Sequence, residues 1–189
     1  MWFLSSHAIL WRRLDQAGHD SARLSEDSGG AIIEGTAVFS ESRRPCRLDY
    51  RVVCDTDWRT VSARVVGWLD TTEIDIDITV TSARVWTFNG RPCVDVHGCD
   101  DIDLSFSPAT NLLPIRRTRL AIGARVAVRA AWLRFPDLIL KPLDQTYERL
   151  AESQYRYESA GGAFVALLET NSVGFVTRYP DLWQLENAG

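Results

Sequence analysis

Apolar and polar residues alternate along much of the chain, which is the pattern of strands in an antiparallel sheet with one solvated face. The clearest run is residues 73–80, where isoleucine or valine occupies every even position and Glu, Asp or Thr every odd one. The same register continues through Trp86 and Phe88. The pattern predicts one long strand, or two nearly collinear strands, and Asn89-Gly90 then supplies the left-handed turn that a hairpin needs.

Further strands follow from the same alternation. They are expected at residues 48–54, 58–69, 102–106, 126–132, 164–169 and 175–179. Helical spacing is scarce: it favours a helix over residues 144–152, where Asp144 can cap the first turn, and it allows a short helix within residues 107–113. We therefore expect an all-β, mainly antiparallel fold, a curled sheet or spiral β-roll with one or two short helices, because long open sheets must curl or close to protect their edges.

The chain length favours one domain. The sequence has 189 residues, of which 46% are hydrophobic and 24% charged, and this size allows a sizeable apolar core in a single domain over residues 1–189. Residues 50–65 and 164–179 share a strand–polar turn–strand pattern, which hints at an internal duplication. The alternative is that all antiparallel hairpins look alike at this level.

The charge balance excludes some functions. Lys and Arg number 21 and Asp and Glu 25, a net charge of −4, which excludes a strongly basic nucleic-acid binder. Lys141 is the only lysine. Arginine suits planar binding of carboxylate or phosphate, although high-GC codon usage explains the same excess. The sequence has no apolar run of 18 residues and its first residues lack a secretory signal pattern, so we expect a cytoplasmic protein without an integral membrane segment.

The four cysteines suggest packing rather than metal chemistry. Cys46, Cys54, Cys93 and Cys99 form no Cys-x-x-Cys pair. Cys93, His97 and Cys99 offer three metal ligands, but no second cluster stands nearby in the sequence to complete a tetrahedral zinc site. We therefore expect small buried hydrophobes, and neither a metal nor a cofactor.

The most specific segment of the sequence is residues 101–117. An Asp-x-Asp strand ends at a proline, a Thr-Asn pair follows, and Leu-Leu-Pro-Ile leads into two arginines. This run resembles the hallmark of the glycolipid-binding family of bacterial proteins. The matching positions are Asp101, Asp103, Ser107, Pro108, Thr110, Asn111, Leu113, Pro114, Ile115, Arg116 and Arg117. Weaker pieces elsewhere follow the family's order over nearly the whole chain, and Thr118 departs from it, since an apolar residue is expected there.

The resemblance implies a spiral β-roll, similar to a doubled version of the half-barrel of bacterial lipoprotein carriers. It implies no established enzymatic activity. Together with the apolar interior that a curled sheet encloses, it favours a binding protein that holds an amphiphile, a glycolipid or a fatty-acyl compound, in an apolar cavity.

Seven residues are the candidates for ligand contacts, each with a structural alternative. Arg116 and Arg117, taken as adjacent strand positions, point to opposite faces, and one of them can orient a head group; the alternative is an ion pair with Asp101 or Asp103. Thr110 and Asn111 can bond sugar hydroxyls or stabilise their own turn. Three tryptophans can line the site or pack in the core, and they are Trp58, Trp86 and Trp132.

Two other function classes stay open. One is a hydrolase-like enzyme that uses His97 with nearby aspartates, although the sequence has no Gly-x-Ser-x-Gly elbow and no glycine-rich phosphate loop. Asp75 and Asp77 share the polar face of one strand, as expected for a solvated surface rather than a glycosidase pair. The other class is a structural module that dimerises through sheet edges, so the chain is expected to be a monomer or a homodimer.

Overall fold

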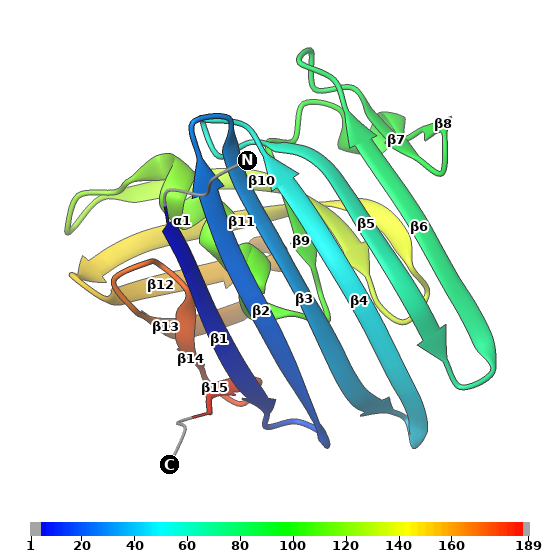
Figure 1. The fold of residues 1–189 in the computed structure, drawn as a ribbon. Coiled ribbons are helices and arrows are strands. Elements are labelled where there is room, and N and C mark those ends of the chain that lie inside the picture. Colours follow the sequence, from blue (N-terminus) through cyan, green and yellow to red (C-terminus); the bar gives the residue numbers. More distant parts are fainter. Residues whose placement is uncertain (1–4, 187–189) are drawn as a thin grey trace.

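A computed structural model describes residues 5–186, which form one curled sheet of fifteen strands (Figure 1). The strands are β1 (Ser5–Arg13), β2 (Gly18–Asp27), β3 (Gly30–Glu41), β4 (Arg44–Cys54), β5 (Thr60–Leu69), β6 (Thr72–Val80), β7 (Trp86–Phe88), β8 (Arg91–Pro92), β9 (Asp101–Leu104), β10 (Arg125–Arg134), β11 (Ile139–Ala151), β12 (Gln154–Ser159), β13 (Phe164–Thr170), β14 (Val176–Tyr179) and β15 (Trp183–Leu185). The helical pieces are α1 (Leu112–Thr118) and the 3-10 turns η1 (Val94–Val96), η2 (Pro108–Asn111) and η3 (Ala160–Gly162). The predicted fold class is confirmed.

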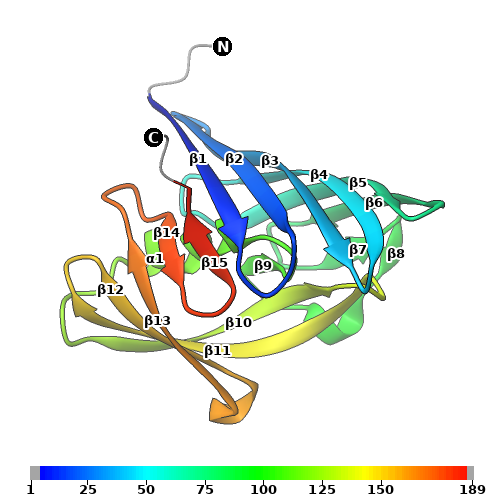
Figure 2. The same ribbon diagram turned by 90° about the horizontal axis from the view of Figure 1, so that it is seen from below.

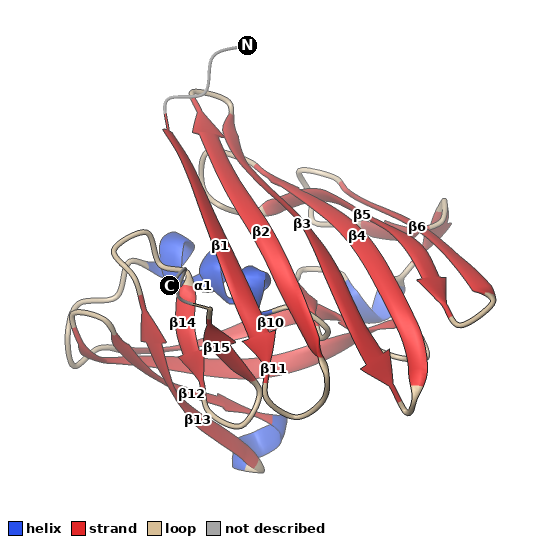
Figure 3. Cartoon of the chain, turned by 60° about the horizontal axis from the view of Figure 1, so that its bottom comes forward, coloured by secondary structure: helices blue, strands red, loops and turns tan. Residues whose placement is uncertain are grey.

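The strand order makes the sheet a roll. It runs β8-β7-β6-β5-β4-β3-β2-β1-β15-β14-β13-β12-β11-β10-β9, so every neighbouring pair except β1–β15 is consecutive in the chain. All pairs are antiparallel except β9–β10. Figure 2 shows the long strands β1–β6 as one wall and β10–β13 as a second wall, with α1 and β9 between them. Figure 3 shows how little of the chain is helical.

The sheet does not close, but its two edges are short. β8 has two residues and β9 has four. The start of β5 lies against β9: the amide of Thr60 donates to the carbonyl of Asp100 (2.9 Å), and the amide of Ile102 donates to Oγ1 of Thr60 (3.0 Å). Arg84 donates to three backbone carbonyls at this junction, those of Thr60, Cys99 and Asp100. The roll is thus fastened by side chains where sheet pairing ends.

The buried core consists of the inward residues that the alternation of the sequence predicts. In β6, Ile74, Ile76, Ile78 and Val80 are buried and the polar residues between them are exposed. The inward side chains of the other strands join these in one apolar cluster. Cys46, Cys54 and Cys99 are buried in that cluster, Cys93 is half-buried, and all four are free. Within residues 5–186, no helix is long and apolar enough to cross a membrane.

The prediction that the strand of residues 73–80 runs on to Phe88 is wrong. The chain turns at Thr81 and β7 pairs antiparallel with β6, so that Val80 faces Trp86 and Ile78 faces Phe88. Opposite residues of an antiparallel pair lie on the same face of the sheet. The alternation therefore passes through the turn without a break, and the sequence pattern alone does not reveal the hairpin.

The predicted helix over residues 144–152 is also wrong, because these residues lie in β11 and the turn that follows it. The register of β11 against β12 shifts between Arg149 and Ala151. A bulge inserts an extra residue into one strand, which breaks the period of two. The apolar residues around the bulge consequently acquire a spacing that resembles a helical stripe.

Candidate ligand-binding site

The specific run of residues 101–117 forms the segment that fills the roll. β9 ends at Leu104, and the turn after it is held by side-chain bonds to the backbone. Oγ of Ser107 accepts from the amide of Ala109 (3.1 Å), and Oγ1 of Thr110 accepts from the amide of Leu104 (3.1 Å). Thr110 is buried, and its hydroxyl stabilises the turn, which was the alternative to a bond with a sugar hydroxyl.

Arg116 and Arg117 lie in helix α1, so the prediction of a strand at these positions is wrong. Pro114 stands in the first turn of α1, where a missing amide costs no intrahelical hydrogen bond. Consecutive helical residues are about 100° apart around the axis, so the two arginines leave the helix in different directions. They have different partners.

Arg117 makes an ion pair with Asp101, one of the alternatives considered for it. Its Nε and Nη2 contact the two carboxylate oxygens at 3.0 and 2.5 Å, and Nη1 lies 3.4 Å from Asp100. Arg116 contacts Glu26 (2.5 Å), and its guanidinium lies 4.4 Å from the ring centroid of Trp58. Trp58 is itself buried.

An aromatic pocket lies on the inner face of the roll, beside the same segment. Its volume is about 260 Å³. Its polar lining includes Asp103 and Asn111. The aromatic lining consists of Trp132, Tyr157, Phe164, Tyr179 and Trp183, and aliphatic side chains are added by Leu104, Leu143 and Leu182.

Asp103 is the charged group of the aromatic pocket. It stands opposite Trp132 in the β9–β10 pair, and Nε2 of Gln145 donates to its Oδ2 (2.6 Å). Burial raises the pKa of Asp103 to about 6, and the hydrogen bond from Gln145 opposes that rise. The Nδ2 group of Asn111 donates to the hydroxyl of Tyr147 (2.9 Å), and within residues 5–186 the amide oxygen of Asn111 accepts no hydrogen bond, so it can accept one from a ligand.

The aromatic wall is a packed cluster rather than a set of isolated rings. Tyr157 contacts Phe164 and Tyr179 with ring centroids 6.0 and 6.1 Å apart, both edge to face. Phe164 is 37% exposed and the two tyrosines are buried. Edge-to-face contacts hold rings in defined orientations, so the wall is preformed.

A buried polar triad lies behind the pocket and joins it to the wall of long strands. Oγ of Ser107 contacts Oδ2 of Asp20 (2.5 Å) and the hydroxyl of Tyr50 (3.0 Å), and that hydroxyl lies 3.0 Å from the same carboxylate oxygen. Asp20 is fully buried. Burial raises its pKa to about 7, against the lowering effect of Ser107, Tyr50 and Arg13.

The family model described as "Putative glycolipid-binding" matches residues 8–185. The chain belongs to this family. It is also similar to a solved structure, a "duf1089 family protein" from Pseudomonas aeruginosa, with 31% identity, 97% of this chain and 95% of that chain covered, and a TM-score of 0.76. A search of curated proteins found no match.

Of the seven residues predicted as ligand contacts, the structure brings Asn111 and Trp132 into the aromatic pocket. Trp86 is fully buried and donates its indole N–H to the carbonyl of Cys99 (3.0 Å). The other four contact protein groups: Thr110 bonds within its turn, Arg117 and Arg116 pair with Asp101 and Glu26, and Trp58 lies beside the guanidinium of Arg116. Thus residues 101–117, the hallmark run of the glycolipid-binding family, fill the interior of the roll and also form one side of the aromatic pocket.

Sequence reasoning missed most of the pocket wall. The sequence indicates Asp103 as a member of the family hallmark and as an ion-pair partner for an arginine, but not as a ligand contact. Tyr179 is one of the weaker positions that match the family, and no sequence motif marks Tyr157, Phe164 or Trp183 as part of a site. Tyr155 and Tyr157 alternate with polar residues in β12, which is a signal that one aromatic face points inward. The glycolipid-binding hallmark does not include any of these aromatic residues.

His97 lies outside the aromatic pocket. It is exposed at the end of η1, and its neighbour Asp95 pairs with Lys141 (3.3 Å). Asp100 and Asp101 contact arginines instead: Arg59 lies 3.2 Å from Asp100, and Arg117 binds Asp101. The aspartates near His97 in the sequence are therefore engaged with other side chains.

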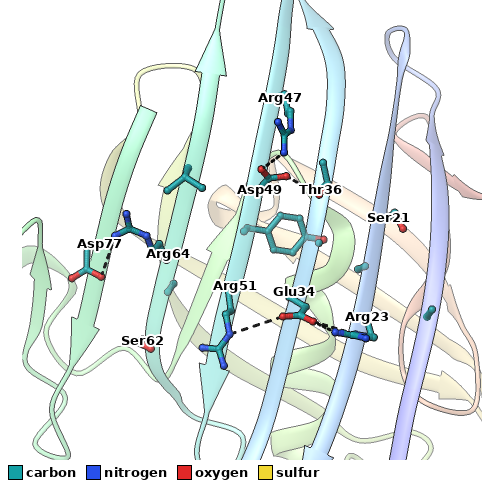
Figure 4. A pocket seen from close by; sticks show the side chains of 16 residues that line it. Ser21, Arg23, Glu34, Thr36, Arg47, Asp49, Arg51, Ser62, Arg64 and Asp77 are labelled. Carbon is teal, nitrogen blue, oxygen red and sulfur yellow. Dashed lines mark hydrogen bonds and ion pairs between the residues drawn. The ribbon is translucent and has the colours of Figure 1, made fainter. Parts of the chain in front are cut away.

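A shallow outer groove of about 670 Å³ lies on the solvated face of β1–β6. Figure 4 shows Arg23, Glu34 and Arg51 joined in a row across three strands of this groove. Nearby, Arg47 contacts Asp49 (2.6 Å). The groove has the paired charges of a solvated sheet face, and it lacks the aromatic wall of the inner pocket.

Proposed function

We propose that the aromatic pocket binds the carbohydrate head group of a glycolipid. The observation that carries this proposal is the placement of Asp103 and Asn111, two hydrogen-bonding groups, beside a preformed wall of aromatic rings. Aromatic faces pack on the C–H face of a sugar ring, and carboxylate and amide oxygens accept hydrogen bonds from its hydroxyls. The family to which the chain belongs supports the same ligand class.

The size of the pocket supports a head group rather than a whole lipid. Ligand pockets usually measure about 300–1,000 Å³, and this one measures about 260 Å³. Phe164, Leu143 and Leu182 are partly exposed and can contact the first methylene groups of an acyl chain. Each buried methylene adds about 0.8 kcal/mol, so a sugar bearing a short chain binds more tightly than the free sugar.

The test compares three ligand classes on the intact chain. Binding of short-chain alkyl glycosides below their micelle concentration, of free monosaccharides and of fatty acids is measured by calorimetry, with tryptophan fluorescence as a second readout. We expect alkyl glycosides to bind most tightly. Asp103→Asn should weaken this binding roughly tenfold, because hydrogen bonds to a charged acceptor are lost. Asp77→Asn, on the outer face, is the matched control.

Two results would contradict the proposal. One is fatty-acid binding as tight as that of an alkyl glycoside of equal chain length, because contacts with the sugar would then add nothing to the affinity. The other is an alkyl-glycoside affinity that neither Asp103→Asn nor Trp132→Leu changes. Native mass spectrometry of protein extracted without detergent would then identify what the chain carries.

A further inference from the structure

A second hollow, of about 590 Å³, lies at one end of the roll. It is formed where three connections meet: the segment after α1, the turn between β11 and β12, and the loop between β13 and β14 (left side of Figure 2). Three arginines line it, together with one carboxylate, Glu152. We call it the arginine hollow, and the arginines are Arg116, Arg119 and Arg149.

Arg149 is held in place by neutral groups. Its Nη1 donates to the carbonyl of Leu120 (2.9 Å) and its Nη2 to the carbonyl of Glu152 (2.7 Å). Backbone carbonyls orient the guanidinium without cancelling its charge. The plane of this group is therefore fixed before any ligand arrives, which lowers the ordering cost of binding.

Arg119 is the most available cation of the three. It is exposed at the C-terminal end of α1 with φ 46°, and within residues 5–186 it forms no ion pair or side-chain hydrogen bond. Arg116 is less free, because Glu26 and Trp58 hold it, but it borders the same space. The hollow thus has three arginines against two carboxylates, Glu152 in its lining and Glu26 beside Arg116, in a protein whose net charge is −4.

Hydroxyl groups complete the lining. Ser153, Thr170 and Ser172 border the hollow, and Oδ1 of Asn171 accepts three amides of its own loop, including that of Gly174 (3.0 Å). Guanidinium groups with nearby hydroxyl donors are the chemistry that binds tetrahedral oxyanions, because arginine presents paired N–H donors to two oxygens at once.

We propose that the arginine hollow is a binding site for a phosphate group. It is separate from the aromatic pocket, since the two lie toward opposite ends of β12, which spans about 17 Å at roughly 3.3 Å per residue. The two hollows share no lining residue, so the phosphate site can be tested independently of the proposed head-group site.

The phosphate can belong to a soluble compound or to an anionic lipid. The lipid source is supported by two exposed apolar residues near the hollow, Ile122 (63% exposed) and Leu150 (40%). The loop that carries Ile122 is tied to Arg149, because the amide of Gly123 donates to its carbonyl (2.7 Å). Basic residues beside exposed apolar side chains favour the surface of an anionic membrane.

The experiment uses the full chain and two probes. Inorganic phosphate is titrated while the arginine Nε–Hε signals are followed by NMR, and sedimentation measures binding to phosphatidylglycerol vesicles against phosphatidylcholine vesicles. We expect Arg119→Gln to weaken phosphate binding roughly tenfold. Arg47→Gln, an exposed arginine of the outer groove, should leave it unchanged. Arg119 is exposed, so its variant should fold normally.

The outcomes distinguish the source of the phosphate. Phosphate binding together with phosphatidylglycerol binding that Ile122→Ser reduces supports a lipid phosphate, whereas phosphate binding without vesicle binding supports a soluble phosphate compound. Absence of binding to both probes overturns the proposal. So does binding of either probe that Arg119→Gln and Arg47→Gln affect equally, because the charge of the whole surface would then be responsible.

Discussion

The guanidinium of Arg117 holds both carboxylate oxygens of Asp101, with Nε–Oδ1 at 3.0 Å and Nη2–Oδ2 at 2.5 Å. This pair fastens α1 to β9. The Asp101 side chain is 1% exposed and that of Arg117 is 17% exposed, so water solvates the pair poorly. Removal of one partner leaves the other charge buried without compensation, and that loss is larger than the net stabilisation by the pair itself.

Arg117→Gln should therefore lower the free energy of unfolding by about 3 kcal/mol. The measurement is urea unfolding followed by far-ultraviolet circular dichroism. Arg47→Gln breaks the exposed Arg47–Asp49 pair and should cost less than about 1 kcal/mol. Equal losses in the two variants would show that the buried pair has no special role in holding α1.

Gly35→Ala should destabilise the wall of long strands. A Cβ at this position would lie 2.4 Å from the hydroxyl oxygen of Tyr50 and 2.5 Å from the carbonyl oxygen of Ser21. Tyr50 would have to move away from Asp20, so we expect a loss of roughly 1–3 kcal/mol in thermal or urea unfolding. Gly29→Ala is the control, because its only near contact is a flexible aspartate side chain at 3.2 Å. An unchanged stability of Gly35→Ala would mean that Tyr50 does not cross β3 at this glycine.

Asp20 should make the stability depend on pH. Its folded pKa is about 7 against 3.8 for the ordinary side chain, so between these values the folded state binds more protons than the unfolded state. The stability contributed by this group is therefore full below pH 4, falls as the pH rises to about 7, and is constant above that. The slope is at most about 1.4 kcal/mol per pH unit.

Asp20→Asn removes this titration. The difference in unfolding free energy between variant and wild type should shift in favour of the variant from pH 4 to pH 7. Urea unfolding at several pH values measures it, and Asp75→Asn, an exposed aspartate, is the comparison. A difference that stays constant with pH would show that Asp20 titrates normally in the fold.

Head-group binding should weaken in acid. Asp103 has a pKa of about 6, and its ionised form is the stronger hydrogen-bond acceptor. Affinity for an alkyl glycoside should therefore fall roughly tenfold from pH 7.5 to pH 5, with a midpoint near 6. In Asp103→Asn the profile should be flat; a drop that survives this substitution belongs to another group.

The alternation of the sequence was enough to predict the inward faces of β4 and β6, because burial of one face of a sheet requires it. It did not predict the turn between β6 and β7, because the alternation passes through that turn unchanged. It did not predict the bulge in β11 either, because the extra residue gives the apolar positions a spacing that resembles a helix. The aromatic pocket escaped prediction for another reason. Asp103, Tyr157 and Trp183 meet only because the sheet curls, and the amount of curl is not encoded in any short segment.

The strand order has a consequence for how the molecule assembles and opens. Each half of the sheet grows by pairing strands that are consecutive in the chain, which keeps the search for partners short. Between β1 and β15 the halves pair at three residue positions, with two further backbone hydrogen bonds, from Leu14 to Leu182 and from Glu186 to Leu10, and with the packing of Trp11 on Phe175. This seam is expected to form last and to exchange its amide hydrogens sooner than the centres of β3 and β4, so local opening of the roll should begin there.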